Sequence, residues 1–112
     1  MPHFIIDCSS NILSDVSESK ILKAVLNAAD ATTLFVKEDI KVRVNAYKEF
    51  EVGGKKTNFI HVFGYILEGR TAEQKAKLSK NVVEVLTAMC PAVKFIAMSV
   101  DEFAIAGYCN RD

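Results

Sequence analysis

The sequence contains few cysteines, and those it has show no recognisable pattern. Cys8, Cys90 and Cys109 are odd in number and lack the spacing of zinc ligands. Small disulfide frameworks use even sets of cysteines in secreted chains, whereas isolated thiols are typical of a reducing compartment. The cysteines therefore predict reduced thiols, a cytoplasmic location, and neither a disulfide framework nor a metal site.

The sequence also lacks an excess of charge and any long hydrophobic run. Lysine and arginine total 14, aspartate and glutamate total 14, and the longest basic run is Lys55-Lys56. Such a chain has no broad positive field for phosphates, so we expect no nucleic-acid partner. No segment approaches a membrane span of about 18 apolar residues, and the amino terminus, with an acid at Asp7, is unlike a signal peptide. We therefore expect no membrane partner.

Glycine-rich phosphate loops are missing as well. Gly53-Gly54 has neither a Walker spacing nor a GxGxxG spacing, so no nucleotide cofactor is expected. What is present is an ordinary globular composition, because half of the 112 residues are hydrophobic and a quarter are charged. This length predicts a single domain over residues 1–112. Small domains bury a low fraction of their surface when alone, which favours association with other copies.

The first half of the chain carries a strand pattern, a helix pattern and a second strand pattern. Residues 3–8 are short, apolar and β-rich, and the polar residues 9–11 predict a loop after them. From Ser17 to Ala31 apolar residues recur at helical spacing. Residues 40–47 alternate between apolar and polar side chains, which predicts a half-buried strand. The polar set of this strand is Lys41, Arg43, Asn45 and Tyr47.

The second half repeats this order. Gly53-Gly54 predicts a turn before a β-rich run over residues 58–67, which we expect to lie beside the strand at 40–47. A helix over residues 71–89 should follow, because Thr71-Ala72-Glu73-Gln74 has the spacing of a capping box and Pro91 stops the helical pattern. A final strand is predicted over residues 95–103.

The order strand, helix, strand, strand, helix, strand indicates two βαβ units in series. Each unit requires a parallel pair of strands joined by a right-handed crossover. We therefore predict an α+β fold, in which duplicated units form a four-stranded mixed sheet with both helices on one face. The opposite face would need a cover, which other subunits could supply. The polar tail over residues 107–112 is expected to be loose.

Pro2 has the most distinctive chemistry in the sequence. Methionine before proline is normally removed, and this would leave a secondary amine at the amino terminus. Ordinary α-amino groups have a pKa of about 8, which partial burial and nearby cations lower. A base tuned toward neutrality can take a proton from an enol or an activated carbon. With Met1 retained, the nitrogen would be an amide without a basic lone pair, and the proline would be an ordinary second residue.

Four segments carry a resemblance to a known family. They are Met1-Pro2-His3-Phe4-Ile5, Cys8-Ser9-x-Asn11-Ile12, Ile40-Lys41-Val42-Arg43-Val44 and Gly69-Arg70-Thr71. Together they resemble the 5-carboxymethyl-2-hydroxymuconate isomerase family of the tautomerase superfamily, in order and over nearly the whole chain. The resemblance implies a homotrimer of βαβ-βαβ subunits, in which the proline lies at the base of a pocket near a subunit boundary.

The resemblance also implies roles for individual residues. Pro2 takes the part of the catalytic amine, and Arg43 best fits the basic residue that binds a substrate carboxylate. Lys41 stands where better-known members carry an arginine, and lysine lacks the planar two-pronged contact of arginine. Lys41 and Arg43 leave the same face of their strand, so they could hold one anion together, with a solvated polar face as the alternative. Arg70, at the helix entry, is a weaker binding candidate or a surface residue.

The remaining candidates have structural interpretations that we favour. His3 directly follows the proposed base, and we expect a packed or interface histidine rather than one that shapes the surroundings of the amine. His61 lies in an aromatic strand, where a hydrogen-bonded structural histidine without a metal is expected. Tyr47 shares a face with Arg43 and could line a pocket, although aromatic residues on strands usually pack. Nothing near Cys8 favours a reactive thiolate.

These observations predict a cofactor-independent isomerase that shifts a proton on an unsaturated 2-hydroxy or 2-keto carboxylic acid, as in the catabolism of aromatic compounds. Pro2 would accept a proton and return it to another carbon of a delocalised dienolate, while Arg43 and Lys41 anchor and stabilise the anion. Three alternatives stay open: another proline-dependent reaction on a keto acid or conjugated acid, a catalytically inactive oligomeric module that binds small molecules, and an unrelated ferredoxin-like domain.

Overall fold

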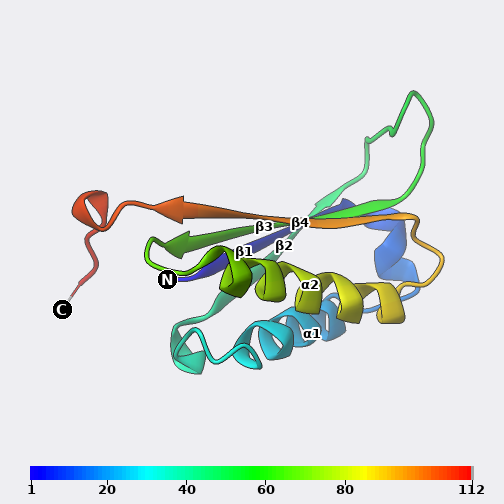
Figure 1. Cartoon of the computed structure of the whole chain (residues 1–112). Coiled ribbons are helices and arrows are strands. Elements are labelled where there is room, and N and C mark those ends of the chain that lie inside the picture. Colours follow the sequence, from blue (N-terminus) through cyan, green and yellow to red (C-terminus); the bar gives the residue numbers. More distant parts are fainter. Residues whose placement is uncertain (112) are drawn as a thin grey trace.

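Strands and helices follow one another in the order β1, α1, β2, β3, α2, β4 (Figure 1). A computed structural model describes residues 1–111. The elements are β1 His3–Ser9, α1 Glu18–Asp30, β2 Lys41–Tyr47, β3 Phe59–Leu67, α2 Ala72–Met89 and β4 Phe95–Phe103. The predicted helices and strands are therefore confirmed. The loop expected over residues 9–11 is instead the end of β1 and a 3₁₀ turn at Ser10–Ser14.

The four strands form one mixed sheet in the order β2-β1-β3-β4. Strand β1 pairs in parallel with β2, β3 pairs in parallel with β4, and the two units meet where β1 and β3 run antiparallel. Each parallel pair is joined by one helix, and both helices cover the same side of the sheet (Figure 1). This arrangement confirms the predicted duplication of βαβ units.

The expectation that β2 and β3 are neighbours is wrong, because β1 lies between them. Alternate residues of β3 are fully buried, whereas β2 carries exposed polar side chains that suit an edge. Burial therefore favours β3 at the centre of the sheet. Gly53 and Gly54 still form a tight turn, since both have positive φ and Val52 bridges Lys55. That turn lies within the projecting segment that connects β2 to β3, and it does not pair the two strands as a hairpin (Figure 1).

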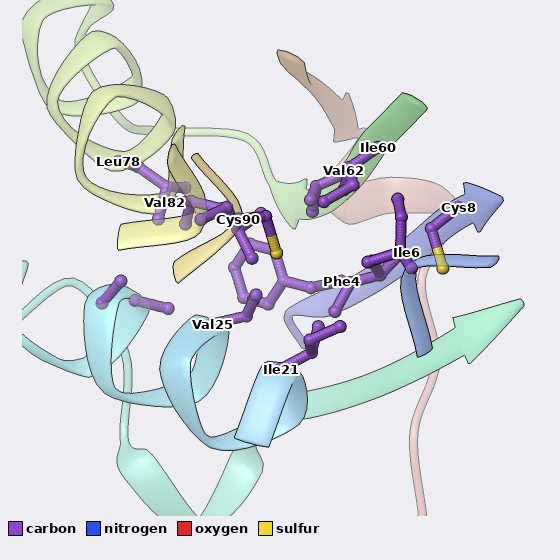
Figure 2. Close-up of a cluster of buried hydrophobic side chains, with 14 of the residues drawn as sticks. Phe4, Ile6, Cys8, Ile21, Val25, Ile60, Val62, Leu78, Val82 and Cys90 are labelled. Carbon is purple, nitrogen blue, oxygen red and sulfur yellow. The ribbon is translucent and has the colours of Figure 1, made fainter. Parts of the chain in front are cut away.

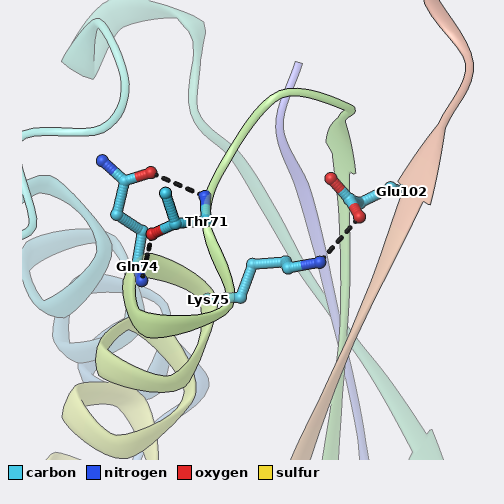
Figure 3. A network of polar contacts seen from close by, with 4 residues as sticks. All are labelled: Thr71, Gln74, Lys75 and Glu102. Carbon is cyan, nitrogen blue, oxygen red and sulfur yellow. Dashed lines mark hydrogen bonds and ion pairs between the residues drawn. The ribbon is translucent and has the colours of Figure 1, made fainter.

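Both helices begin at side-chain caps. The Ser17 hydroxyl accepts a hydrogen bond from the Lys20 amide at the start of α1. At α2 the capping box is complete, because the Gln74 amide donates to the Thr71 hydroxyl and the Thr71 amide donates to the Gln74 side chain (Figure 3). Lys75 in the next position forms a 2.7 Å ion pair with Glu102, which ties α2 to β4 (Figure 3).

The hydrophobic core lies between the helices and one face of the sheet. On β1, Phe4 and Ile6 are fully buried and point toward the helices (Figure 2). Both helices contribute to this layer, with Ile21 on α1 and Leu78 on α2 among the buried side chains. The alternate apolar residues of the strands and the apolar faces of the two helices therefore pack into one core.

The other face of the sheet consists of the intervening side chains, which are half-buried or exposed except for the buried Ser9 at the end of β1. Large apolar members of this face are Tyr47, Phe95 and Phe103, whose exposed fractions are 37%, 42% and 41%. Beyond β4 the chain forms a 3₁₀ turn at Ile105–Gly107. Asp112, the last residue of the tail that we expected to be loose, lies outside the described residues. Neither helix within residues 1–111 is long and apolar enough to cross a membrane.

Gly64 is a position at which the core leaves no room for a side chain. A Cβ atom added there would lie 2.7 Å from the Met98 methyl group and 3.2 Å from the Phe4 ring. Gly64→Ala should therefore lower the free energy of unfolding by about 1 kcal/mol or more, because overpacking outweighs the gain in strand propensity. Urea denaturation would measure this change.

The matched control for this prediction is Gly107→Ala, since no atom lies within 4 Å of a Cβ at that position. Its stability should change by less than about 0.5 kcal/mol. In a Met98→Ala background the cost of Gly64→Ala should shrink, which a double-mutant cycle would detect. Equal effects of Gly64→Ala and Gly107→Ala would contradict the packing argument.

Candidate active site at the amino-terminal end of the sheet

A shallow hollow of about 340 Å³ lies on the open face of the sheet, near the amino terminus. All four strands contribute to it: His3 and Ile5 from β1, Arg43 from β2, Tyr65 from β3 and Phe103 from β4. Its volume is at the lower end of the range for small-molecule pockets. One side of the hollow carries cationic and imidazole groups, and the other side is aromatic.

The strand register brings these residues together. His3 on β1 is paired with Tyr65 on β3, and Ile5 on β1 is paired with Arg43 on β2. All of them occupy the positions of their strands that alternate with the buried ones, so their side chains emerge on the open face. Phe103 joins them at the end of β4, where its ring stacks on that of Tyr65 at 5.6 Å between centroids.

Arg43 and His3 are in direct contact. The Arg43 Nη1 atom lies 3.1 Å from His3 Nδ1. Partial burial lowers the pKa of His3 below its usual value, and the charges of Arg43 and Lys41 lower it further. His3, which we expected to pack, is half-buried, and its ring lines the hollow. Strand alternation alone could have placed His3 and Arg43 on one face.

Pro2 and Lys41 meet at the same end of the sheet. The Pro2 side chain is fully buried, and its carbonyl oxygen accepts a 3.1 Å hydrogen bond from the Lys41 amide. The Lys41 ammonium group donates to the Asp39 carbonyl oxygen at 2.8 Å. Burial lowers the pKa of the Met1 amine, Lys41 lowers it further, and Asp39 opposes the shift. The amino terminus thus lies in surroundings that favour an uncharged amine.

The other predicted binding residue, Arg70, has a different environment. Its Nη2 atom donates a 2.6 Å hydrogen bond to the Leu34 carbonyl oxygen, and its guanidinium group lies 5.3 Å from the centre of the Phe35 ring. Arg70 is not among the residues that line the hollow. Of the three cations predicted to bind substrate, Lys41 therefore lies beside the amino terminus, Arg43 lines the hollow, and Arg70 does neither.

The aromatic wall of the hollow, Tyr65 and Phe103, was not anticipated from the sequence. The sequence indicated a role for these two rings only weakly, because an aromatic residue on a half-buried strand is usually a packing residue. Tyr47, which we considered for the pocket, instead donates to the Asp7 carboxylate at 3.3 Å. Aromatic character alone did not distinguish these positions.

The other candidate residues have structural partners. His61 is hydrogen-bonded as expected, with Nε2 lying 2.9 Å from Ser99 Oγ. Burial raises the pKa of the Cys8 thiol to about 11, so this cysteine is protonated at neutral pH. Among residues 1–111, no three histidine, cysteine, aspartate or glutamate side chains gather as metal ligands do. This end of the sheet therefore combines a terminal amine whose pKa is lowered with an exposed cation, Arg43, in a partly aromatic hollow.

Comparison with known proteins gives one family and several similar structures. The sequence profile described as 5-carboxymethyl-2-hydroxymuconate isomerase matches residues 2–107. No curated protein matches the chain by sequence. The fold resembles that of a 5-carboxymethyl-2-hydroxymuconate isomerase from Deinococcus radiodurans R1, with a TM-score of 0.82, 21% identity, and coverage of 99% of this chain and 89% of that chain.

Two further structures are similar at lower identity. A 5-carboxymethyl-2-hydroxymuconate delta-isomerase has a TM-score of 0.76 and 12% identity, and the match covers 100% of this chain and 87% of that chain. A symmetric trimer of wild-type fused 4-OT has a TM-score of 0.78 and 17% identity, with coverage of 91% and 85%. At these identities the likeness shows a shared fold.

The influence of Lys41 on the terminal amine can be measured directly. Lys41→Met removes a cation that disfavours the protonated amine, so the pKa of the amine should rise toward its ordinary value. The pH dependence of the resonances of the isotope-labelled terminal residue would report this pKa. Lys77→Met, on the exposed side of α2, is the matched control and should leave the pKa unchanged. An unchanged pKa in Lys41→Met would show that Lys41 has no electrostatic effect on the amine.

Proposed function

The chain belongs to the 5-carboxymethyl-2-hydroxymuconate isomerase family, and from this premise we propose that it is a cofactor-independent tautomerase with Pro2 as general base. Its substrate would be an unsaturated 2-hydroxy or 2-keto carboxylic acid. One observation supports this proposal above all: the amino terminus, the Arg43 guanidinium group and an aromatic wall share one end of the sheet. Isomerase chemistry of this kind needs a base, an anion site and a surface for a conjugated chain.

The base would be the Pro2 nitrogen after removal of Met1. Lys41, which lowers the pKa of the Met1 amine, is bonded through its backbone to Pro2 and would act on the new terminus in the same sense. Lowering the pKa of an amine increases its uncharged fraction near neutral pH, and the uncharged form can accept a proton. Pro2 would take a proton from the hydroxyl or from an activated carbon and return it to a different carbon.

The anion site would be formed by Arg43, with Lys41 beside it. Arg43 can contact a carboxylate through two N–H groups, and Lys41 adds a second positive charge on the same face of β2. Preplaced cations stabilise the negative charge that spreads through a dienolate intermediate. Tyr65 and Phe103 would support the planar conjugated chain by stacking. Arg70 is a weaker third cation, because part of its guanidinium group is bonded to the Leu34 carbonyl.

We also propose that the chain works as a homotrimer. A similar structure, fused 4-OT, forms a symmetric trimer. In this chain the face of the sheet opposite the helices exposes large apolar side chains at both ends of β4, and of these Phe103 lines the hollow whereas Phe95 lies at the other end of the strand. Burial of such a patch between copies would remove it from water and would also enclose the hollow. The molecular mass in solution would decide this point.

Pro2→Ala tests the catalytic role of the amine. With Met1 shown by intact mass to be absent, this variant exchanges the secondary amine of proline for the primary amine of alanine, which is still a base but is less rigidly placed, so kcat/KM should fall by about tenfold or more. In the wild type, kcat/KM should rise with pH through the pKa of the amine, because the unprotonated form is the active one. This acidic limb should lie below the ordinary value of about 8.

A second form of the protein controls for changes in structure. One residue added before Pro2 keeps the proline ring but returns its nitrogen to a peptide bond, so activity should be lost while the fold remains. Circular dichroism and solution mass would establish that the fold is intact. If the extended form matches the wild type on every dienol and keto acid that is turned over, the assignment of Pro2 as the base fails, and if the wild type turns over none of them, a binding module is favoured.

Arg43→Gln tests the anion site. Loss of the charge should lower kcat/KM by roughly 100-fold, as for other electrostatic contacts to a developing anion, and Arg43→Lys should have an intermediate effect. Arg70→Gln is the matched comparison at the third cation and should cost less. Steady-state kinetics on one substrate would measure all three variants. A larger loss in Arg70→Gln than in Arg43→Gln would reverse the assignment of the main carboxylate contact.

A further inference from the structure

His3 has a defined chemical relation to Arg43 that the proposed reaction does not use. We infer that His3 is a positioning residue, whose unprotonated Nδ1 accepts a hydrogen bond from Arg43 and holds the guanidinium group toward the carboxylate of a ligand. The inference rests on the carboxylate-binding part of the proposed function. It assigns to His3 a role in ligand binding without direct contact with the reacting atoms.

The direction of the hydrogen bond follows from the chemistry of the two groups. Arginine carries five N–H donors and no acceptor, so the 3.1 Å contact between Arg43 Nη1 and His3 Nδ1 requires a bare nitrogen on the imidazole. His3 must then be the neutral tautomer with its proton on Nε2. The surroundings favour this neutral form, because partial burial, Arg43, Lys41 and the terminal amine all lower the pKa of His3.

The groups that face His3 come from each adjoining strand. Arg43 and Lys41 lie on β2, and Tyr65 is its pairing partner on β3. Asp101 on β4 is in register with Tyr65, on the far side of that residue. The bond to His3 is the single side-chain hydrogen bond that Arg43 makes within residues 1–111.

This bond has a consequence for affinity. Arg43 is exposed, and a free arginine side chain loses rotamer entropy when it is immobilised by a ligand. A guanidinium group already held through Nη1 has fewer orientations to lose, while its other N–H groups stay available to a carboxylate. His3 would therefore strengthen ground-state binding, and its removal should raise KM more than it lowers kcat.

Two nearly isosteric substitutions separate the acceptor from the ring. The amide side chain in His3→Asn would place its carbonyl oxygen near the position of Nδ1, so this variant should keep the bond, whereas His3→Leu removes it. The probe is sorbate, a planar conjugated carboxylate that lacks the 2-hydroxy or 2-keto group required for the proton shift. The Kd for sorbate, from titration calorimetry, should rise about tenfold in His3→Leu and less than threefold in His3→Asn, as expected for a hydrogen bond to a charged group.

A spectroscopic measurement tests the same bond without a ligand. The ¹⁵N and ¹³C resonances of the His3 ring in the wild type should show a protonated Nε2 and a bare Nδ1. A proton on Nδ1 at neutral pH would overturn the inference. So would an equal loss of sorbate affinity in His3→Asn and His3→Leu, because the ring or its charge, and not the acceptor, would then be responsible.

The outcomes distinguish this inference from the proposed function. Sorbate binding that is lost in Arg43→Gln but unchanged in His3→Leu overturns the role of His3 and leaves the proposed function intact. Sorbate binding that depends on both residues, in a protein that turns over no dienol or keto acid, overturns the tautomerase and supports the role of His3. A wild-type protein that does not bind sorbate contradicts the anion site and, with it, both proposals.

Discussion

Strand β1 lies at the centre of the sheet, and the burial of its alternate side chains determines most of the structure. It is hydrogen-bonded to β2 on one side and to β3 on the other. Phe4 and Ile6 are held in the core between the sheet and the helices, so His3 and Ile5 must point to the open face. A slip of one residue would bury His3 and expose Phe4. The core and the candidate site are therefore two consequences of one register.

The two βαβ units present different chemistry on the open face. The first unit supplies His3 and Arg43, and the second supplies the stacked rings of Tyr65 and Phe103. Duplication provides two similar frames, and the antiparallel contact between β1 and β3 joins them so that a cationic side faces an aromatic one. The ion pairs of the described residues, Lys75–Glu102 and Lys80–Glu84, lie elsewhere. Arg43 thus retains a positive charge that no carboxylate within residues 1–111 neutralises by direct contact.

Local signals in the sequence were reliable where a local interaction determines the structure. The capping box at Thr71 and Gln74 predicted the start of α2, and Pro91 its end, because caps and prolines act within a few residues. The neighbour of β2 was predicted wrongly for the opposite reason. Gly53-Gly54 does form its turn, but strand order depends on which strands can bury most apolar surface, and β3 buries more than β2. The apolar area that each strand buries depends on the whole sheet, so a local turn motif could not predict the strand order.

The sequence by itself determined the duplicated βαβ order, the two helices and the alternation that sends Lys41 and Arg43 to one face, because these follow from periods of 2 and 3.6 residues. The family resemblance of Pro2 and its neighbours was also visible in the sequence alone. Only the tertiary structure decided that His3 bonds to Arg43, that Tyr65 and Phe103 form the opposite wall, and that Arg70 turns to the Leu34 carbonyl. These contacts join residues far apart in the chain, and their geometry depends on strand order and register, which no local pattern encodes.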